Sequence, residues 1–139
     1  MAKARRKRTE RADADKYLQV GRSLRRTAAD LNDLGESAYG NALGILCIHS
    51  AIAYTDAVTI RAKGLRAADQ HGRAADLLAE LFPANAATTR AVRSLRILLS
   101  RKDDVEYSGS YYSIEDAQAM FGHLESYADW VETLYLRLA

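Results

Sequence analysis

The sequence has a single cysteine, Cys47, and a single proline, Pro83, among its 139 residues. One cysteine cannot form a disulfide within the chain, which excludes a disulfide-stapled scaffold and suits a reducing cytoplasm. The scarcity of proline, together with plentiful alanine, leucine and arginine, favours helices, because these three residues cost little free energy in a helix. No segment alternates apolar and polar residues over a sustained stretch, so we expect no β-sheet.

Motifs that identify common classes of enzyme are also missing. The chain has no glycine-rich phosphate loop and no serine nucleophile elbow. Its histidines, cysteine and carboxylates lack the spacing of metal ligands, so we expect no metal and no cofactor. His49 lies in an apolar segment and is expected to be a hydrogen-bonded core residue rather than a catalyst. His71 is expected at an exposed helix start, and His123 near the edge of an apolar helix face.

The net charge is only +2, but it is unevenly distributed. Residues 1–11 hold six basic side chains and one acid, a net charge of +5, so the rest of the chain carries about −3. We expect a basic disordered arm over 1–11 and a single domain over 12–139, which is long enough for a core of its own. The arm has two interpretations: it contacts nucleic acid or another polyanion, or it is a solubilising tail without a specific partner.

The segment from Ser37 to Thr55 is apolar enough to suggest a membrane span, because it carries no aspartate, glutamate, lysine or arginine and only one histidine. A lipid-facing helix needs about 20 predominantly apolar residues. This segment is too polar for that role, since it includes Asn41, Ser50 and Tyr54. We therefore expect a central helix buried by its neighbours, in a cytoplasmic protein that does not bind a membrane.

Apolar residues recur at three- and four-residue steps along most of the chain, as in amphipathic helices. The expected helices cover about 12–34, 37–63, 69–82, 85–102 and 113–138. Ser113 is predicted as the N-cap of the last helix, and Gly35 and Gly64 as the ends of the first two. Because the connections are short, neighbouring helices should pack antiparallel, which predicts an all-α antiparallel bundle of four to five helices.

The fourth expected helix carries a row of arginines opposite its apolar stripe. Arg90, Arg93 and Arg96 point away from that stripe, and Arg101 returns to their side. A row of guanidinium groups on one helix face can bind phosphates. A solvated surface helix shows the same pattern, because charged residues commonly lie opposite an apolar stripe. The sequence alone leaves both interpretations open.

A polar, tyrosine-rich hinge separates the last two expected helices and reads RKDDVEYSGSYYSIED over 101–116. The segments around it include HSAIAYTDAVTI at 49–60, HGRAADLL at 71–78, SRKDDVEYSG at 100–109 and YSIEDAQAMFGHLESYADWVETL at 112–134. In this order and spacing, over about 40–138, the chain resembles HEPN domains. These are small helical domains found in prokaryotic nucleotidyltransferase-associated proteins and RNase toxins.

The resemblance implies a bundle of four or five helices that forms a homodimer through the face near the hinge. In catalytic HEPN members, an Arg-x(4–6)-His motif follows the helix that corresponds to the fourth helix here. The arginine holds the phosphate, and the histidine serves acid–base cleavage of RNA with the 2′-hydroxyl as nucleophile. In this chain Arg101 and Tyr107 are the candidate catalytic residues, with tyrosine in place of histidine. A phenol titrates near pH 10, so we expect a non-catalytic module rather than an RNase.

HEPN relatives with the tyrosine form resemble binding or adaptor modules that act beside a separate nucleotidyltransferase. In some such pairs a tyrosine near the motif is modified, which makes Tyr107, Tyr111 and Tyr112 candidate acceptors here. The residues expected to contact a protein, nucleotide or RNA partner belong to the arginine row and the hinge: Arg90, Arg93, Arg96, Arg101, Lys102, Asp104 and Tyr107.

Three functions stay open at this point. The first is a non-catalytic dimeric module that binds a protein or nucleotide partner through Arg101–Tyr107. The second is an RNase toxin component that binds or cleaves RNA. The third is a helical bundle whose hinge is purely structural. The hinge acids Asp103, Asp104 and Glu106 bear on this choice: they follow a helix C-terminus, where the helix dipole disfavours acids, and are expected to pair with arginines of the first or fourth helix.

Overall fold

The computed structural model describes residues 6–67, 73–106 and 109–138, so His71 and Tyr107 lie outside the described residues. Its α-helices are α1 Ala14–Leu34, α2 Gly40–Lys63, α3 Arg73–Leu81, α4 Ala86–Ser100, α5 Lys102–Glu106 and α6 Ile114–Arg137. Two short 3-10 helices, η1 Arg11–Asp13 and η2 Ser37–Tyr39, and two strands, β1 Arg6–Arg8 and β2 Leu65–Ala67, complete the described elements. The predicted all-α bundle is confirmed.

Local chemistry fixes the helix ends that were predicted. Gly35 and Gly64 adopt left-handed backbone conformations, with φ of 61° and 66°, which glycine accepts without a steric penalty. Ser113 caps α6 by accepting a hydrogen bond from the Asp116 N–H, and Asn85 caps α4 in the same way from the Thr88 N–H. Short-range signals of this kind are readable in the sequence because donor and acceptor lie within one turn.

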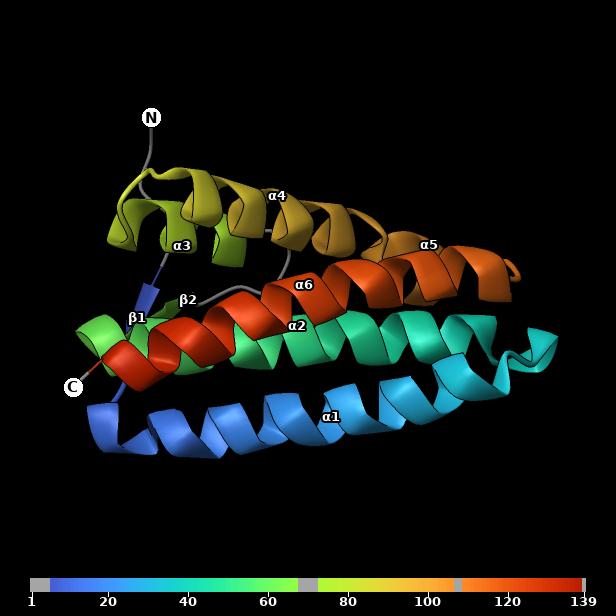
Figure 1. Ribbon diagram of the computed structural model, residues 1–139, viewed down its shortest axis with the longest axis horizontal. Coiled ribbons are helices and arrows are strands. Elements are labelled where there is room, and N and C mark those ends of the chain that lie inside the picture. Colours follow the sequence, from blue (N-terminus) through green and yellow to red (C-terminus); the bar gives the residue numbers. More distant parts are fainter. Residues whose placement is uncertain (1–5, 68–72, 107–108, 139) are drawn as a thin grey trace.

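Helix α2 forms the centre of the bundle, and nearly all of its residues from Leu43 to Ile60 are buried. Figure 1 shows α2 and α6 running side by side through the middle, with α1 on one side and α4 on the other. The continuous helical stretch Ser37–Lys63 is long and apolar enough to cross a membrane, but 83% of its most apolar window is buried inside the protein. Its apolar character is therefore that of a core helix.

The direction of the helices follows the chain order only in part. Sequential neighbours α1 and α2 are antiparallel, as are α4 and α6 (Figure 1). Helices α2 and α6 run in the same direction, because α3 and α4 carry the chain back along the bundle between them. Two contacts agree with this parallel arrangement. Thr55 of α2 hydrogen-bonds Tyr127 of α6, and Arg61, later in α2, hydrogen-bonds the carbonyl of Leu138, which also comes later in the chain than Tyr127.

A small antiparallel sheet corrects two expectations, the absence of any sheet and a disordered arm over 1–11. Strand β1 pairs with β2, with Arg6 opposite Ala67 and Arg8 opposite Leu65. The Arg6 guanidinium also forms an ion pair with Glu80 of α3. Because each strand has only three residues, it is too short to show the alternation of apolar and polar residues that would predict a strand from the sequence. Residues 6–11 therefore belong to the folded body, and 1–5 lie outside the part of the chain that is described.

The hinge packs directly on the first turns of α2, where two glycines allow close approach. A Cβ atom on Gly40 would lie 1.9 Å from the Tyr112 carbonyl oxygen, and one on Gly44 would lie 2.7 Å from a Val105 methyl carbon. Both positions therefore exclude any side chain larger than hydrogen unless the hinge moves. This contact places α5 and the hinge against α2, and so positions the candidate site described next.

Candidate binding surface on α4 and the hinge

The arginine row lies on the exposed face of α4, as its spacing predicts. Arg96 Nη1 binds Asp76 Oδ1 of α3 at 2.8 Å, and Arg73 shares the same carboxylate at 3.4 Å. Arg90 and Arg93 are exposed and form no ion pair within the described residues. Two of the three α4 arginines thus keep their charge available for a ligand, whereas the charge of Arg96 is partly neutralised.

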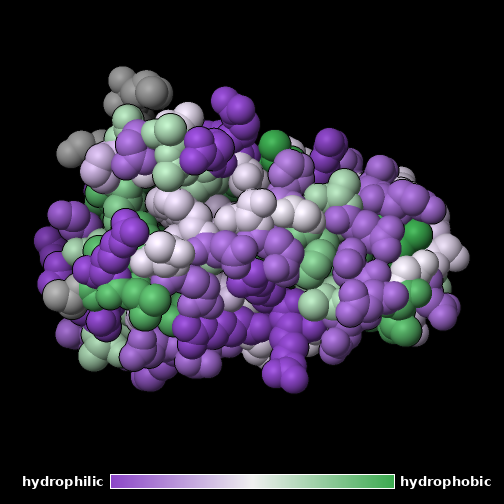
Figure 2. All heavy atoms as spheres, viewed as in Figure 1, coloured by the Kyte–Doolittle hydropathy of each residue, from purple (hydrophilic) through white to green (hydrophobic). Residues whose placement is uncertain are grey.

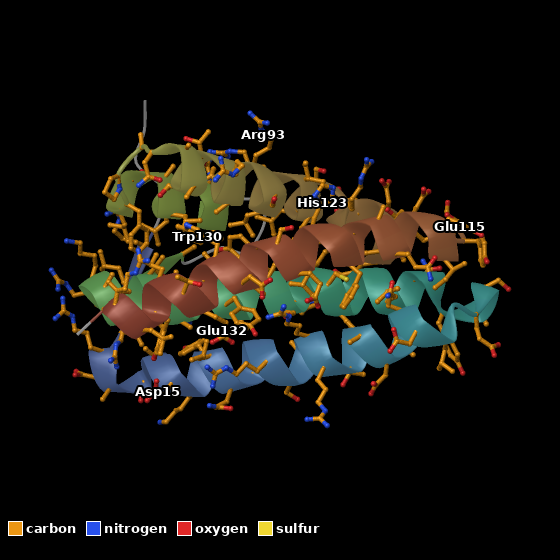
Figure 3. All side chains as sticks on the ribbon, viewed as in Figure 1. Asp15, Arg93, Glu115, His123, Trp130 and Glu132 are labelled. Atoms are coloured by element: carbon orange, nitrogen blue, oxygen red, sulfur yellow. The ribbon has the colours of Figure 1, made fainter. Side chains whose placement is uncertain are left out.

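A groove of about 450 Å³ runs between α4 and α6 beside these arginines. Arg90 and Arg93 line its α4 wall, and His123 and Trp130 line its α6 wall. Figure 3 places His123 and Trp130 along the part of α6 that faces α4, with Arg93 on α4 above them. The structure therefore brings His123, which the sequence placed only at a helix edge, to the same groove as the arginine row.

Arg101 follows the last residue of α4 and is exposed, and it forms no ion pair with any described residue. The next residue behaves differently: Lys102, expected to be a surface contact, is only 7% exposed. Its ammonium group donates to Glu106 Oε2 at 2.7 Å across one turn of α5. Lys102 therefore holds α5 together and is not presented to a partner. Asp104 is exposed on the same turn.

His49 occupies a different environment from the one expected. Its side chain is 40% exposed, and Nε2 lies 2.8 Å from Glu106 Oε1. Burial opposes ionisation of Glu106, but hydrogen bonds with Lys102 and His49 outweigh it and lower the pKa of its carboxyl. Glu106 pairs with these two residues rather than with arginines of α1 or α4. Partly exposed His49 of α2 and Glu106 of α5 thus form a histidine–carboxylate pair beside the hinge that the sequence did not indicate.

Asn41, in the first turn of α2, fixes the backbone of the hinge. Its Nδ2 donates to the carbonyls of Val105 and Ser110 at 3.1 and 3.2 Å, and its Oδ1 accepts from the Tyr112 N–H at 2.9 Å. The hydroxyl of Tyr111 donates to the Ser37 carbonyl at 2.6 Å. The Asn41 amide therefore sets the shape of the hinge by hydrogen-bonding three of its backbone groups, and the Tyr111 hydroxyl ties the hinge to the backbone of η2.

The candidate modification sites differ in accessibility. Tyr111 is exposed, although its hydroxyl is already hydrogen-bonded. Tyr112 is partly buried; burial raises the pKa of its phenol, and the charge of Arg101 opposes that rise. The Tyr112 hydroxyl is therefore expected to be protonated near neutral pH. The third candidate, Tyr107, lies outside the described residues.

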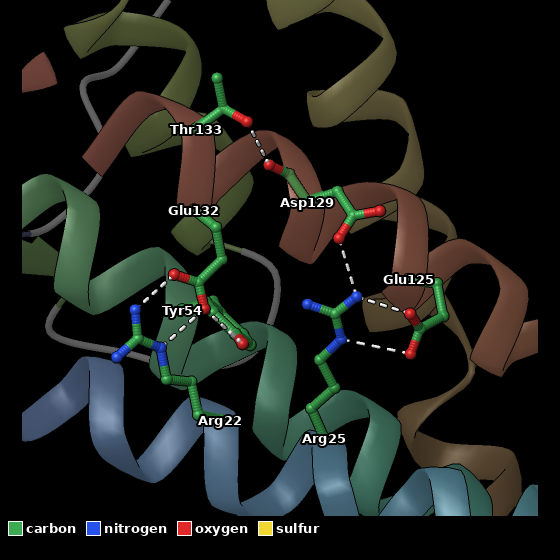
Figure 4. Close-up of polar contacts among 7 residues, drawn as sticks. All are labelled: Arg22, Arg25, Tyr54, Glu125, Asp129, Glu132 and Thr133. Atoms are coloured by element: carbon green, nitrogen blue, oxygen red, sulfur yellow. Dashed lines mark hydrogen bonds and ion pairs between the residues drawn. The ribbon is translucent and has the colours of Figure 1, made fainter. Parts of the chain in front are cut away.

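A second polar cluster, between α1 and α6, was not predicted. Figure 4 shows Arg25 of α1 donating to both carboxylate oxygens of Glu125, at 3.2 and 2.5 Å, and to Asp129 at 2.8 Å. Arg22 forms a similar bidentate pair with Glu132 at 2.8 and 2.6 Å. We call these residues, with Tyr54, the α1–α6 clamp.

All clamp residues except Asp129 line a cleft of about 580 Å³, larger than the α4–α6 groove. Its hydrogen bonds explain why it makes a weaker site for an anion. The bond from Arg22 lowers the pKa of the Glu132 carboxyl, and the Tyr54 hydroxyl also donates to Glu132 at 3.0 Å. The donors of Arg22 and Arg25 are thus directed at carboxylates of the protein itself, and the cluster joins two helices that otherwise contact each other little.

Comparisons of the chain with protein-family models, with curated proteins and with solved structures gave no match. The resemblance to HEPN domains therefore stays a prediction, and the function is inferred from geometry and charge. Among the described residues, no group of three or more histidine, cysteine or acidic side chains is arranged to hold a metal ion.

Proposed function

We propose that this chain is a HEPN-type binding module that holds a nucleic acid on the surface formed by α4 and the hinge. The observation that carries the proposal is that three arginines of α4 and the hinge are exposed and unneutralised by described residues. Arg90, Arg93 and Arg101 are exposed and free of ion pairs within the described residues. Helix α4 contains no acidic residue that could neutralise them locally.

The length of the row favours a polyanion over a single small anion. Arg90 and Arg93 are neighbours on one helix face, and Arg101 lies eleven positions after Arg90. At about 1.5 Å per residue the row extends over about 16 Å, which spans several phosphates of a nucleic-acid strand. Guanidinium groups suit this task because they stay charged and can donate two parallel hydrogen bonds to a phosphate.

The test is the affinity of the purified protein for a labelled single-stranded RNA, measured by fluorescence anisotropy over a series of salt concentrations. Arg90→Ala, Arg93→Ala and Arg101→Ala should each weaken binding. Each should also reduce the slope of log K against log salt by about 0.7 for every phosphate that the variant no longer neutralises. Arg26→Ala is the matched control, because Arg26 is also exposed but lies on α1, across the bundle. If the three test variants bind the RNA as tightly as the wild type and the Arg26→Ala control do, the proposal is refuted.

The same proposal includes a homodimer formed through the hinge end and a cytoplasmic location, beside a separate nucleotidyltransferase partner. Exposed apolar side chains support an interface at that end. Leu34, Tyr39 and Tyr111 are exposed large apolar residues, and all three lie where the α1–α2 connection meets the hinge. Figure 2 shows apolar surface at this end of the molecule, at the right of the view.

A second candidate function, cleavage of RNA, is favoured by the His49–Glu106 pair. Histidine is the side chain that most often serves general acid–base catalysis, whereas tyrosine at the motif position rarely does. Glu106 engages Nε2, so Nδ1 would be the atom that exchanges a proton with the 2′-hydroxyl or the leaving oxygen. Arg101 would hold the phosphate at the start of the same short segment.

Cleavage is tested with purified protein and RNA in EDTA, using Arg101→Ala and His49→Gln. If the protein is a nuclease, both variants should lose cleavage, while Arg26→Ala keeps it. Cleavage that survives in His49→Gln would rule out His49 as the acid–base group. Absence of cleavage in the wild type, with RNA still bound through Arg101, would leave the binding module as the function.

A further inference from the structure

The groove between α4 and α6 has the chemistry of a site for a nucleotide. Its volume of about 450 Å³ lies within the range of about 300–1,000 Å³ that is typical of small-ligand pockets. Arg90 and Arg93 provide fixed positive charge, and Ser94 and Ser126 provide hydroxyl groups on opposite walls. No aspartate or glutamate is among the described residues that line it. Its occupant should therefore be an anion.

An aromatic ring completes one wall of the groove. Trp130 packs edge-on against Phe82, with ring centroids 6.2 Å apart and an angle of 86° between the rings, and lies at 6.1 Å from Tyr127. These two contacts hold the indole in place, while the side chain remains partly exposed and lines the groove. A fixed, partly exposed indole is a platform on which a planar ring can stack at a low cost in conformational entropy.

Two side chains that can form hydrogen bonds, His123 and Ser126, lie on the same face of α6 as Trp130. His123, Ser126 and Trp130 are separated by steps of three and four residues, so their side chains point into the groove together. The positive arginines face them from α4, which runs antiparallel to α6. The arrangement thus combines a stacking surface, polar side chains and phosphate-binding guanidinium groups within one groove.

We infer that this groove binds one unstacked base of a single-stranded nucleic acid against Trp130, with the adjoining phosphates held by Arg90 and Arg93. The inference rests on the proposed function and adds to it the strandedness of the ligand and the site of base contact. A duplex hides both faces of its bases and cannot supply this contact, whereas a single strand can turn a base outward onto an aromatic side chain.

Trp130 is the only tryptophan in the chain, so the tryptophan fluorescence of the protein reports on the groove alone. A short oligoadenylate should quench this fluorescence as it binds. A duplex of the same length and ribose 5-phosphate, which supplies charge without a base, should leave it nearly unchanged. Quenching by ribose 5-phosphate equal to that by the oligonucleotide would overturn the stacking contact.

Variants separate the groove from the rest of the surface. Trp130→Leu should weaken oligonucleotide binding, measured by anisotropy, by about tenfold or more, the usual effect of losing one base–aromatic stack. Because Trp130 also packs on Phe82 and Tyr127, a second variant, Ser126→Leu, fills the groove from an exposed position and leaves that packing intact. Thr133→Leu is the control, since it makes the same kind of change on α6 at an exposed position outside the groove lining.

The outcomes distinguish this inference from the proposed function. Weaker binding in Ser126→Leu and Trp130→Leu, with normal binding in Thr133→Leu, supports the groove. If the oligonucleotide binds through Arg101 but Trp130 fluorescence and the affinity of Ser126→Leu stay unchanged, the groove inference fails and the proposed function stands. If the wild type binds no oligonucleotide, both fail.

Discussion

Asp56 is an acidic side chain in the middle of the buried helix α2, with only 4% of its surface exposed. Burial disfavours its charged form and raises its pKa to about 7, although the positive charge of Arg66 on β2 opposes the rise. In the unfolded chain the same carboxyl titrates near its ordinary value of about 4. Between these two pH values the folded protein therefore holds a proton that the unfolded chain releases.

This difference predicts a stability that falls as the pH rises from about 4 to about 7 and stays low above it, because the folded state binds the extra proton. Asp56→Asn keeps the shape of the neutral acid and removes the charge. We expect it to raise the free energy of unfolding at pH 8 by about 2–4 kcal/mol and to change it little near pH 4. Urea unfolding at both pH values measures this, with Asp30→Asn on the exposed face of α1 as the control. A variant no more stable than wild type at pH 8 would contradict the prediction.

At the residue scale, the sequence was informative where an interaction is local. The cap formed by Ser113 and the helix ends at Gly35 and Gly64 could be predicted because each depends on residues within a turn. The His49–Glu106 pair could not, because its members are 57 positions apart. The one available signal was a histidine within an otherwise apolar segment, and that signal also describes a core histidine.

At the scale of elements, the position of the hinge depends on the absence of a side chain at Gly40. A methyl group there would overlap the carbonyl oxygen of Tyr112, which belongs to the backbone and cannot rotate away. Gly40→Ala should therefore destabilise the protein by about 1–3 kcal/mol and displace the hinge, in spite of the better helix propensity of alanine. Chemical denaturation measures the loss, and amide exchange of Val105 and Tyr112 reports the displacement.

Gly122→Ala is the matched control, because a Cβ at this exposed position in α6 would meet no atom within 4 Å apart from the adjoining backbone of its own helix. Helix propensity alone then predicts that Gly122→Ala stabilises the protein by about 0.5–1 kcal/mol. Opposite signs for the two substitutions are expected. If Gly40→Ala also stabilised the protein, the close contact between α2 and the hinge would be wrong.

The elements themselves could be predicted from periodicity, but the way they pair could not. The expected helix boundaries lie within a few residues of those of α1, α2, α4 and α6. The clamp that joins α1 to α6 was missed because Arg22 and Arg25 have no acidic partner nearby in sequence; their partners lie at least 100 positions away. An arginine on a helix surface is ambiguous until its neighbour in space is known, which is why the clamp arginines and the exposed arginines of α4 looked alike.

At the scale of the whole molecule, the structure differs from the prediction in the N-terminal segment. The basic composition of 1–11 predicted a disordered arm, and composition cannot show that backbone groups of β1 find partners in β2. The Thr9 N–H donates to the Gly64 carbonyl at 2.8 Å, directly after the left-handed turn that ends α2. The positive charge of Arg6 is consequently paired with Glu80 of α3.

The proposed homodimer gives the last prediction. An interface at the hinge end would cover Leu34, which is 60% exposed, and a charge placed there would have to be buried on association. Leu34→Glu should therefore shift the protein from a dimer of about 31 kDa, twice the chain mass of 15.4 kDa, to a monomer in light scattering. Leu136→Glu is the control: Leu136 is 86% exposed but lies at the opposite end of the bundle, which also shows apolar surface in Figure 2. A wild type that is monomeric at high concentration would exclude the dimer, whereas a monomer produced by Leu136→Glu alone would move the interface to the C-terminal end and away from the hinge.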